Sequence, residues 1–276
     1  MEVRYAVGPN ETRQFTTSQL RENFLIESLF EPDHLQLCYS HFDRVIIGGV
    51  QPTASSVNLP TYPELRSDYF LERREMGVIN VGNAGTIEVD GQAYELGKLD
   101  CLYIGRGSKQ VTFISQSADS PAQFYLLSAP AHKDYPTRKA AQSEVFSAPM
   151  GSSETANERV IYRYIHHDGL PSCQLVMGLT MLQPGSVWNT MPAHVHDRRM
   201  EAYFYFDLDL AQRIVHLMGQ PTETRHLFVA NHQAIISPPW SIHSGCGTAN
   251  YSFIWGMAGE NLDYADMDMA AIADLR

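Results

Sequence analysis

The sequence predicts an all-β protein built from two tandem β-barrels. Short apolar runs, rich in β-branched and aromatic residues, alternate with turns of Gly, Pro, Asn and Asp. Helical periodicity is scarce, and a faint internal repeat relates the first half of the chain to the second. A chain of 276 residues is long enough for two domains of ordinary size.

Strands account for most of the predicted secondary structure. They are expected at Arg44–Val50, Gly77–Gly82, Gly85–Gly91, Tyr162–His167, Glu201–Asp209 and Tyr251–Met257. The segment that begins at Gly85 is expected to continue into a hairpin, because Asp90-Gly91 can adopt the positive φ angles of a tight turn.

Only two segments are candidates for helices. Thr16 and Gln19 have the spacing of a capping box, and Leu20 and Phe24 share one helical face, which predicts a short helix near Thr17–Asn23. The last twelve residues, ADMDMAAIADLR, are expected to form either a final helix or an ordered tail.

The internal repeat predicts two domains of one architecture. The matched segments are Val50-Gln51-Pro52 with Leu182-Gln183-Pro184, Glu72–Glu75 with Asp197–Met200, Tyr103–Gln110 with Ile236–His243, and Gln123–Ala131 with Tyr251–Gly259. Residues 136–157 are small and polar, as expected of a linker. We therefore expect an N-terminal domain over 1–140 and a C-terminal domain over 158–276, with the boundary within Tyr135–Glu158.

Charge and composition exclude several classes of partner. The formal net charge is −11, which argues against nucleic acid and anionic membranes as partners, although local Arg residues can still bind an acidic small molecule. There is neither a transmembrane run nor an apolar signal-peptide core, so a soluble, cytoplasmic protein is expected. The four cysteines are far apart, which favours buried thiols over disulfides or a cysteine zinc site.

One cluster of residues has the spacing of metal ligands. His194 and His196 would project to the same face of a strand, and Glu201 follows after a charged turn at the start of another strand. His243 comes after a proline turn further along the chain. Three imidazoles and one carboxylate suit a divalent transition metal such as Zn, Mn, Fe, Ni or Co. The other eight histidines have no such spacing and are expected at the surface or in the core, with His41 and His132 as the likeliest exceptions.

The pattern His-x-His-x4-Glu, followed by a Pro turn and His, resembles the two-motif signature of the cupins, which are small jelly-roll β-barrels. The sequence departs from that signature at Trp240, where cupins usually have Gly. The first half resembles the same fold without its metal. At the positions that match His194, His196 and His243 it has Tyr69, Leu71 and Gln110, so the N-terminal barrel is expected to hold no metal.

A closer resemblance runs over the whole chain, to the 5-keto-4-deoxyuronate isomerase family of bacterial pectin breakdown. It rests on Tyr69–Asn80, Trp188–Phe206, Met218–His226, Ser237–Thr248 and Phe253–Asn261. The resemblance implies a zinc-bound bicupin, with one Zn²⁺ per subunit held by His194, His196, Glu201 and His243, and a homohexamer. It also implies that 5-dehydro-4-deoxy-D-glucuronate is isomerised to 3-deoxy-D-glycero-2,5-hexodiulosonate.

The residues that would carry this aldose–ketose chemistry remain open. Tyr203 and Tyr205 share the face of Glu201 and are candidates for proton donation, while Trp188, Thr190 and Pro192 are expected on the face of His194. The candidates for binding the substrate carboxylate are Arg163, Arg198, Arg199 and Arg225. The alternatives are a cupin dioxygenase with Fe(II) in the same ligands and a non-catalytic uronate-binding cupin.

Overall fold

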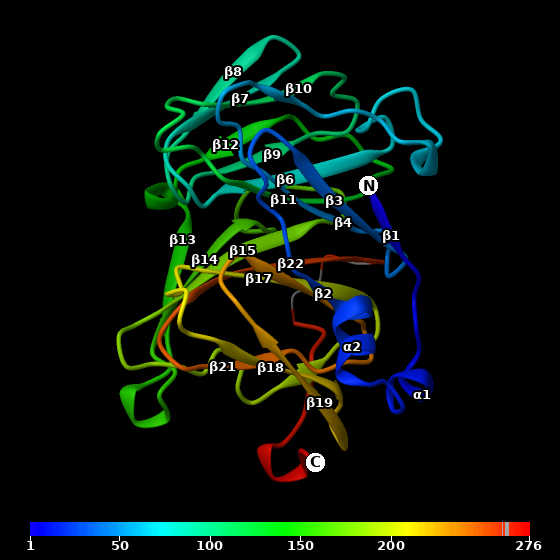
Figure 1. Ribbon diagram of the computed structural model, residues 1–276, viewed down its shortest axis with the longest axis vertical. Helices are drawn as coiled ribbons and strands as arrows, with labels where there is room; N and C mark the ends of the chain where they lie inside the picture. Colours follow the sequence, from blue (N-terminus) through cyan, green and yellow to red (C-terminus); the bar gives the residue numbers. More distant parts are fainter. Residues whose placement is uncertain (261, 263–264) are drawn as a thin grey trace. The chain divides into compact units, whose positions relative to one another are not determined.

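The computed structural model describes residues 1–260, 262 and 265–276, and its chain is mostly β (Figure 1). It divides into two compact units, each assembled from separate stretches of sequence. The first contains Met1–Arg4, Ser28–Phe146 and Arg163–Met177, and the second contains Tyr5–Glu27, Ser147–Tyr162 and Gly178–Arg276. None of the described helices is long and apolar enough to cross a membrane.

The first unit is organised around a seven-stranded sheet. The strand order is β1 (Glu2–Arg4), β3 (Leu35–Ser40), β4 (Ile46–Val50), β11 (Phe124–Pro130), β6 (Arg74–Asn80), β9 (Cys101–Ile104) and β12 (Arg138–Ala140). Strand β1 is parallel to β3, while every other neighbouring pair in this sheet is antiparallel.

The second large sheet also has seven strands. Its order is β13 (Phe146–Met150), β14 (Arg159–Ile165), β15 (Val176–Leu182), β22 (Ser252–Gly259), β17 (Arg199–Phe206), β20 (Gln233–Ser237) and β2 (Leu25–Ile26). The strands that contain the sequence repeat occupy equivalent positions in the two sheets. Counted along the strand orders given above, β4 and β15 are the third strands, β11 and β22 the fourth, β6 and β17 the fifth, and β9 and β20 the sixth.

Smaller sheets complete each barrel. One contains β5 (Val57–Asn58), β10 (Val111–Ser115), β7 (Gly85–Val89) and β8 (Gln92–Leu96), and the other contains β19 (Glu223–Val229), β18 (Ile214–Gln220) and β21 (Ser244–Gly247). The predicted hairpin is confirmed, because β7 and β8 pair across Asp90 and Gly91, which have φ angles of 49° and 85°. A short pair joins β16 (His194–Val195) to β23 (Asp268–Met269).

In the part of the chain that the structure describes, two α-helices and four 3-10 turns supplement the sheets. The helices are α1 (Pro9–Thr12) and α2 (Thr17–Phe24), and the turns are η1 (Pro63–Leu65), η2 (Gln142–Glu144), η3 (Ser153–Thr155) and η4 (Ile272–Asp274). Helix α2 begins with the expected capping box of Thr16 and Gln19, and it buries Leu20 and Phe24. The C-terminal segment forms β23 and η4, so it is the ordered tail among the two predicted forms.

The core of the first unit lies between its two sheets. Apolar side chains from the inner faces of both sheets form one buried cluster, which includes Val78, Leu102 and Leu126 from the large sheet and Ile87 and Phe113 from the small one. The alternation of burial along β7 follows directly from the period of two in a strand. This unit is therefore filled by apolar side chains.

The division into units differs from the single cut expected near residues 135–158. Residues Tyr5–Glu27 are counted with the second unit because β2 pairs with β20 through Leu25 and Ile26. The predicted linker is not plain coil either, since β12, η2, β13 and η3 lie within 136–157. The assignment of an N-terminal domain to 1–140 and a C-terminal domain to 158–276 stays a prediction.

Candidate metal centre

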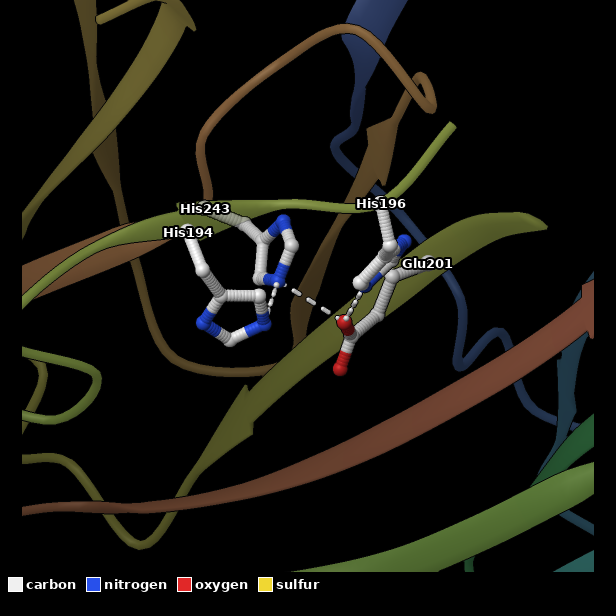
Figure 2. A group of neighbouring side chains, drawn as sticks. All are labelled: His194, His196, Glu201 and His243. Carbon is white, nitrogen blue, oxygen red and sulfur yellow. Dashed lines mark hydrogen bonds and ion pairs between the residues drawn. The ribbon is translucent and has the colours of Figure 1, made fainter. Parts of the chain in front are cut away.

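Three histidines and one glutamate converge inside the second unit (Figure 2). The Oε2 atom of Glu201 lies 3.0 Å from His196 Nε2 and 2.8 Å from His243 Nε2. The Nε2 atoms of His194 and His243 are 3.0 Å apart. The four ligand atoms all lie within 4.8 Å of one another, and all four side chains are buried.

Strand geometry and two loops place these four side chains. His194 is in β16 and His196 follows it, so both imidazoles project to one side, as their spacing predicts. Glu201 lies on β17, and His243 immediately precedes β21. The expected pairing across the Asp197–Arg199 turn differs, because β16 pairs with β23 and not with β17.

The hydrogen bonds around His196 indicate that a cation fits this cluster. His196 Nδ1 lies 3.0 Å from the carbonyl oxygen of Arg199, so Nδ1 carries a proton that it donates to that oxygen. Burial lowers the pKa of His196, but the hydrogen bond and charge of Glu201 outweigh it and raise that pKa, so with no ion bound a protonated ring donates its Nε2–H to the carboxylate. A divalent ion in the place of that proton would be bound by both His196 Nε2 and the Glu201 carboxylate. His196 Nδ1 would meanwhile stay hydrogen-bonded to the Arg199 carbonyl, which orients the ring.

Burial and charge control protonation in the cluster. Burial and the neighbouring His243 lower the pKa of His194 to about 3, which favours the neutral imidazole that a metal requires. Burial alone would raise the pKa of the Glu201 carboxyl, but His243 and the hydrogen bonds from His196 and His243 outweigh it and hold that pKa well below its usual range. An ionised carboxylate and a neutral imidazole are the forms that bind metal.

Both tyrosine candidates lie beside the cluster. The Tyr203 hydroxyl is 2.8 Å from Thr190 Oγ1, and the Tyr203 ring lies edge-on to His243 with centroids 5.4 Å apart. The Tyr205 hydroxyl contacts Asn189 Nδ2 at 3.4 Å and His216 Nδ1 at 2.7 Å. The Tyr205 hydroxyl is therefore hydrogen-bonded to two side chains, whereas the Tyr203 ring packs against the candidate ligand His243.

The loop before His194 departs from the expected alternation. Pro192 is exposed and Trp188 is half-buried, whereas Asn189 is completely buried. The expectation of one shared inward face is therefore wrong for Pro192, because residues 189–193 form no strand in which a period of two could apply, whereas the Thr190 hydroxyl does reach Tyr203 beside the cluster. Asn189 is the polar residue of this loop that is completely buried, and its Oδ1 accepts the Gly245 N–H at 2.6 Å.

The structure does not bring the four arginine candidates to the ligand cluster with free guanidinium groups. Arg198 is exposed and pairs with Glu260, and Arg225 pairs with Glu223 and donates to the Arg13 carbonyl. The candidate Arg163, which belongs to the first unit, pairs with Asp168 and lies over the Phe146 ring. Arg199 is buried and pairs with Asp266 at 2.7 Å. The contribution of Arg199 to the cluster is its backbone carbonyl, which orients His196.

One histidine beside the cluster escaped the sequence analysis. His216 is completely buried in β18, which agrees with the expectation of a surface or core residue, but its position beside Tyr203 and the candidate ligands was not expected. The signal was present, because Ile214, His216 and Met218 alternate along one strand and all three are buried. Of the two expected exceptions, His41 contacts the Tyr39 ring and His132 lies beside Cys173.

The matching positions of the first unit differ chemically. Leu71 belongs to the apolar core, and Gln110 is exposed. A second group that could hold an ion, His166, His167 and Asp168, lies in a turn of this unit, where Arg163 already pairs with Asp168. That the N-terminal barrel holds no metal stays a prediction.

Two β-barrels of one strand order, the second with a buried three-histidine, one-glutamate cluster, make this protein a bicupin with a candidate metal centre. Comparisons with known proteins give its family. The chain belongs to the KduI/IolB family, whose sequence profile matches residues 30–272. Proteins from Shouchella clausii and Formosa agariphila, both named 4-deoxy-L-threo-5-hexosulose-uronate ketol-isomerase, are 54% and 55% identical to it. The alignments cover all of this chain and 100% and 98% of those proteins.

Solved structures support the fold independently. An IolB-like protein from Salmonella typhimurium superposes with a TM-score of 0.73 at 15% identity, over 90% of this chain and 97% of that one. A variant of Bacillus subtilis oxalate decarboxylase superposes with a TM-score of 0.55 at 9% identity, over 82% of this chain and 71% of that one. At such low identity these structures show that the bicupin fold is shared.

Proposed function

We propose that this protein is a ketol-isomerase that converts 5-dehydro-4-deoxy-D-glucuronate to 3-deoxy-D-glycero-2,5-hexodiulosonate. The observation that carries the proposal is the buried cluster of His194, His196, Glu201 and His243, in a chain more than half identical to proteins named for this activity. The substrate is a sugar acid, so the net charge of −11 requires local recognition of its carboxylate.

The reaction moves hydrogen without net oxidation of the molecule. A proton leaves C2, which bears the hydroxyl, and a proton is delivered to C1 of the aldehyde. The hydroxyl proton on O2 is lost while C2 becomes the ketone, and O1 gains a proton as C1 becomes the alcohol. Between these steps the substrate passes through an enediolate, so the protein must stabilise negative charge on O1 and O2.

We assign a divalent metal ion, with Zn²⁺ as the proposed occupant, to His194, His196, Glu201 and His243. When bound, such an ion supplies Lewis acidity that polarises the carbonyl and acidifies the adjacent C–H bond. The chain's own contribution is to hold the His194 imidazole neutral by burial and to orient His196 through the Arg199 carbonyl. Tyr203, edge-on to His243, is the proposed hydroxyl group for proton transfer at the substrate oxygens.

The direct test uses NMR to monitor conversion of the substrate. The purified protein should turn 5-dehydro-4-deoxy-D-glucuronate into the diulosonate, and in D₂O the product should gain deuterium at its hydroxymethyl carbon, which was the aldehyde C1 of the substrate. Oxygen should not be consumed. Saturable binding of the substrate without conversion would support a non-catalytic binding protein instead, and oxygen uptake would support a dioxygenase; either result would refute the proposed function.

The metal is tested separately from the substrate. Elemental analysis should find one zinc per chain, chelation should abolish turnover, and added Zn²⁺ should restore it. His243→Ala should lower metal content and activity together, because His243 Nε2 faces both Glu201 and His194. Undiminished turnover by the fully metal-free protein would show that the metal is not needed.

The remaining proposals concern assembly and location. We propose that the protein is a homohexamer, as the family resemblance implies, and that it is located in the cytoplasm. The edge strand β13 exposes Phe146 and Met150, which supports a subunit contact there. Light scattering of the purified protein should give a mass near six times 31.0 kDa, and a monomer would contradict the proposal.

A further inference from the structure

His216 is a completely buried histidine in the second unit. It lies on the inner face of β18, and its Nε2 atom has no hydrogen-bond partner among the described residues. Buried polar groups are rarely left without a partner, so such a group calls for an explanation. The Tyr203 ring contacts the rings of both His216 and His243, at centroid distances of 5.8 and 5.4 Å, so the His216 ring lies one side chain away from a candidate metal ligand.

A directed chain of hydrogen bonds determines which nitrogen of His216 carries the proton. Asn189 Oδ1 accepts the N–H groups of Gly245 and Thr190, so the Asn189 Nδ2 group is the one that faces Tyr205 and donates to its hydroxyl. Among the described residues, His216 Nδ1 is then the only acceptor hydrogen-bonded to the Tyr205 O–H, at 2.7 Å.

The neutral ring of His216 therefore carries its proton on Nε2. Burial lowers the pKa of His216 to about 3, with a further contribution from His243, so the ring is neutral at physiological pH. The chain of hydrogen bonds from Asn189 through Tyr205 to His216, called the relay below, thus presents an N–H donor without a positive charge in the interior of the barrel. A neutral donor suits a carbonyl or enediolate oxygen, because it stabilises developing charge without competing for metal ligands.

We propose that His216 is a catalytic residue whose Nε2–H donates a hydrogen bond to O1 or O2 of the substrate during isomerisation. Tyr205 and Asn189 act as positioning residues that hold this tautomer. The inference rests on the proposed function for its substrate, but the tautomer and its relay can be measured on the protein alone.

The backbone opposite His216 is built around this relay. Gly245 pairs with His216 in the β18–β21 ladder. A Cβ atom at position 245 would lie 3.0 Å from both Asn189 Nδ2 and the Tyr205 hydroxyl oxygen. The relay therefore occupies the space that a side chain at 245 would need, which ties the glycine to the orientation of His216.

Three substitutions at one position test the proposal. His216→Leu removes the donor, and we expect kcat to fall about 100-fold or more, with KM and metal content unchanged. His216→Gln places an amide N–H near the Nε2 position and should retain much more activity. His216→Asn places its amide near the Nδ1 position, facing Tyr205, and should be as impaired as His216→Leu. The Asn variant is the matched control, since it is polar and hydrogen-bonding but lacks the proposed donor.

Nitrogen-15 NMR of labelled histidine supplies a readout besides activity. The wild-type protein should show the Nε2–H tautomer of His216, and Tyr205→Phe should give a mixture of tautomers and a smaller loss of kcat. An Nδ1–H tautomer in the wild type would overturn the proposal. So would a His216→Leu variant whose kcat is unchanged, or which changes KM alone. Wild-type protein assayed in parallel separates the two hypotheses, because an inactive wild type refutes the proposed function and leaves the tautomer measurement valid.

Discussion

Glu75→Gln is expected to destabilise the first unit strongly, because this one carboxylate satisfies four donors. Glu75 is completely buried in β6. Its Oε1 accepts the N–H groups of Gln174 and Leu175 at 2.8 and 2.7 Å. Its Oε2 accepts the N–H of Cys173 and the hydroxyl of Tyr103, both at 2.7 Å. The carboxylate thereby fixes residues 173–175 to the large sheet of the unit.

The cost of the substitution follows from counting donors. An amide at position 75 leaves at least one donor without an acceptor, and the better orientation places its NH₂ group at the Oε2 position. There it can donate to the Tyr103 oxygen, but it faces the Cys173 N–H. One unsatisfied buried donor costs about 1–3 kcal/mol, and the two remaining bonds lose their charged acceptor. Because the variant also no longer buries a charge, we expect a net loss of about 2–4 kcal/mol.

Three measurements can localise this loss. Far-UV circular dichroism during urea unfolding reports on the strands of both units. Tryptophan fluorescence reports on the second unit alone, because the three tryptophans, at 188, 240 and 255, all belong to it. The amides of residues 173–175 should exchange about 30-fold faster or more, since each 1.4 kcal/mol is a factor of ten. Tyr103→Phe removes one bond and leaves the three backbone donors paired, so it should cost only about 1 kcal/mol. Unchanged unfolding free energy and unchanged exchange at 173–175 in Glu75→Gln would refute the reasoning.

Three further predictions concern the second unit. Glu201→Gln keeps the shape of the side chain but removes the anion between His196 and His243; elemental analysis should show reduced metal content, and a full complement of metal would exclude Glu201 as a ligand. Gly245→Ala should cost about 1–3 kcal/mol in urea unfolding because its Cβ overpacks the interior, and a neutral effect would count against the tight packing described. Thr16→Ala removes the cap of α2 and should cost about 1 kcal/mol by tryptophan fluorescence, with no change in metal content.

Local features of the structure could be predicted from the sequence. The β7–β8 hairpin depends on two adjacent residues with positive φ, and α2 depends on a capping box four residues long. The candidate ligands were found for a similar reason, since His194 and His196 share a face by strand period alone. The repeat also predicted the shared strand order, because equivalent segments such as β4 and β15 keep both their pattern and their place in the sheet.

Other features depend on contacts between segments far apart in the chain, and only the tertiary structure decided them. Residues 25 and 26 extend the second large sheet because they pair with β20, more than two hundred residues away. Asn189 faces the interior because the loop before His194 is not a strand, and its amide is oriented by Gly245. The proton position on His216 follows from that amide through Tyr205. Periodicity assigns a side chain to a face, but its hydrogen-bond partners depend on which other strands pack against that face.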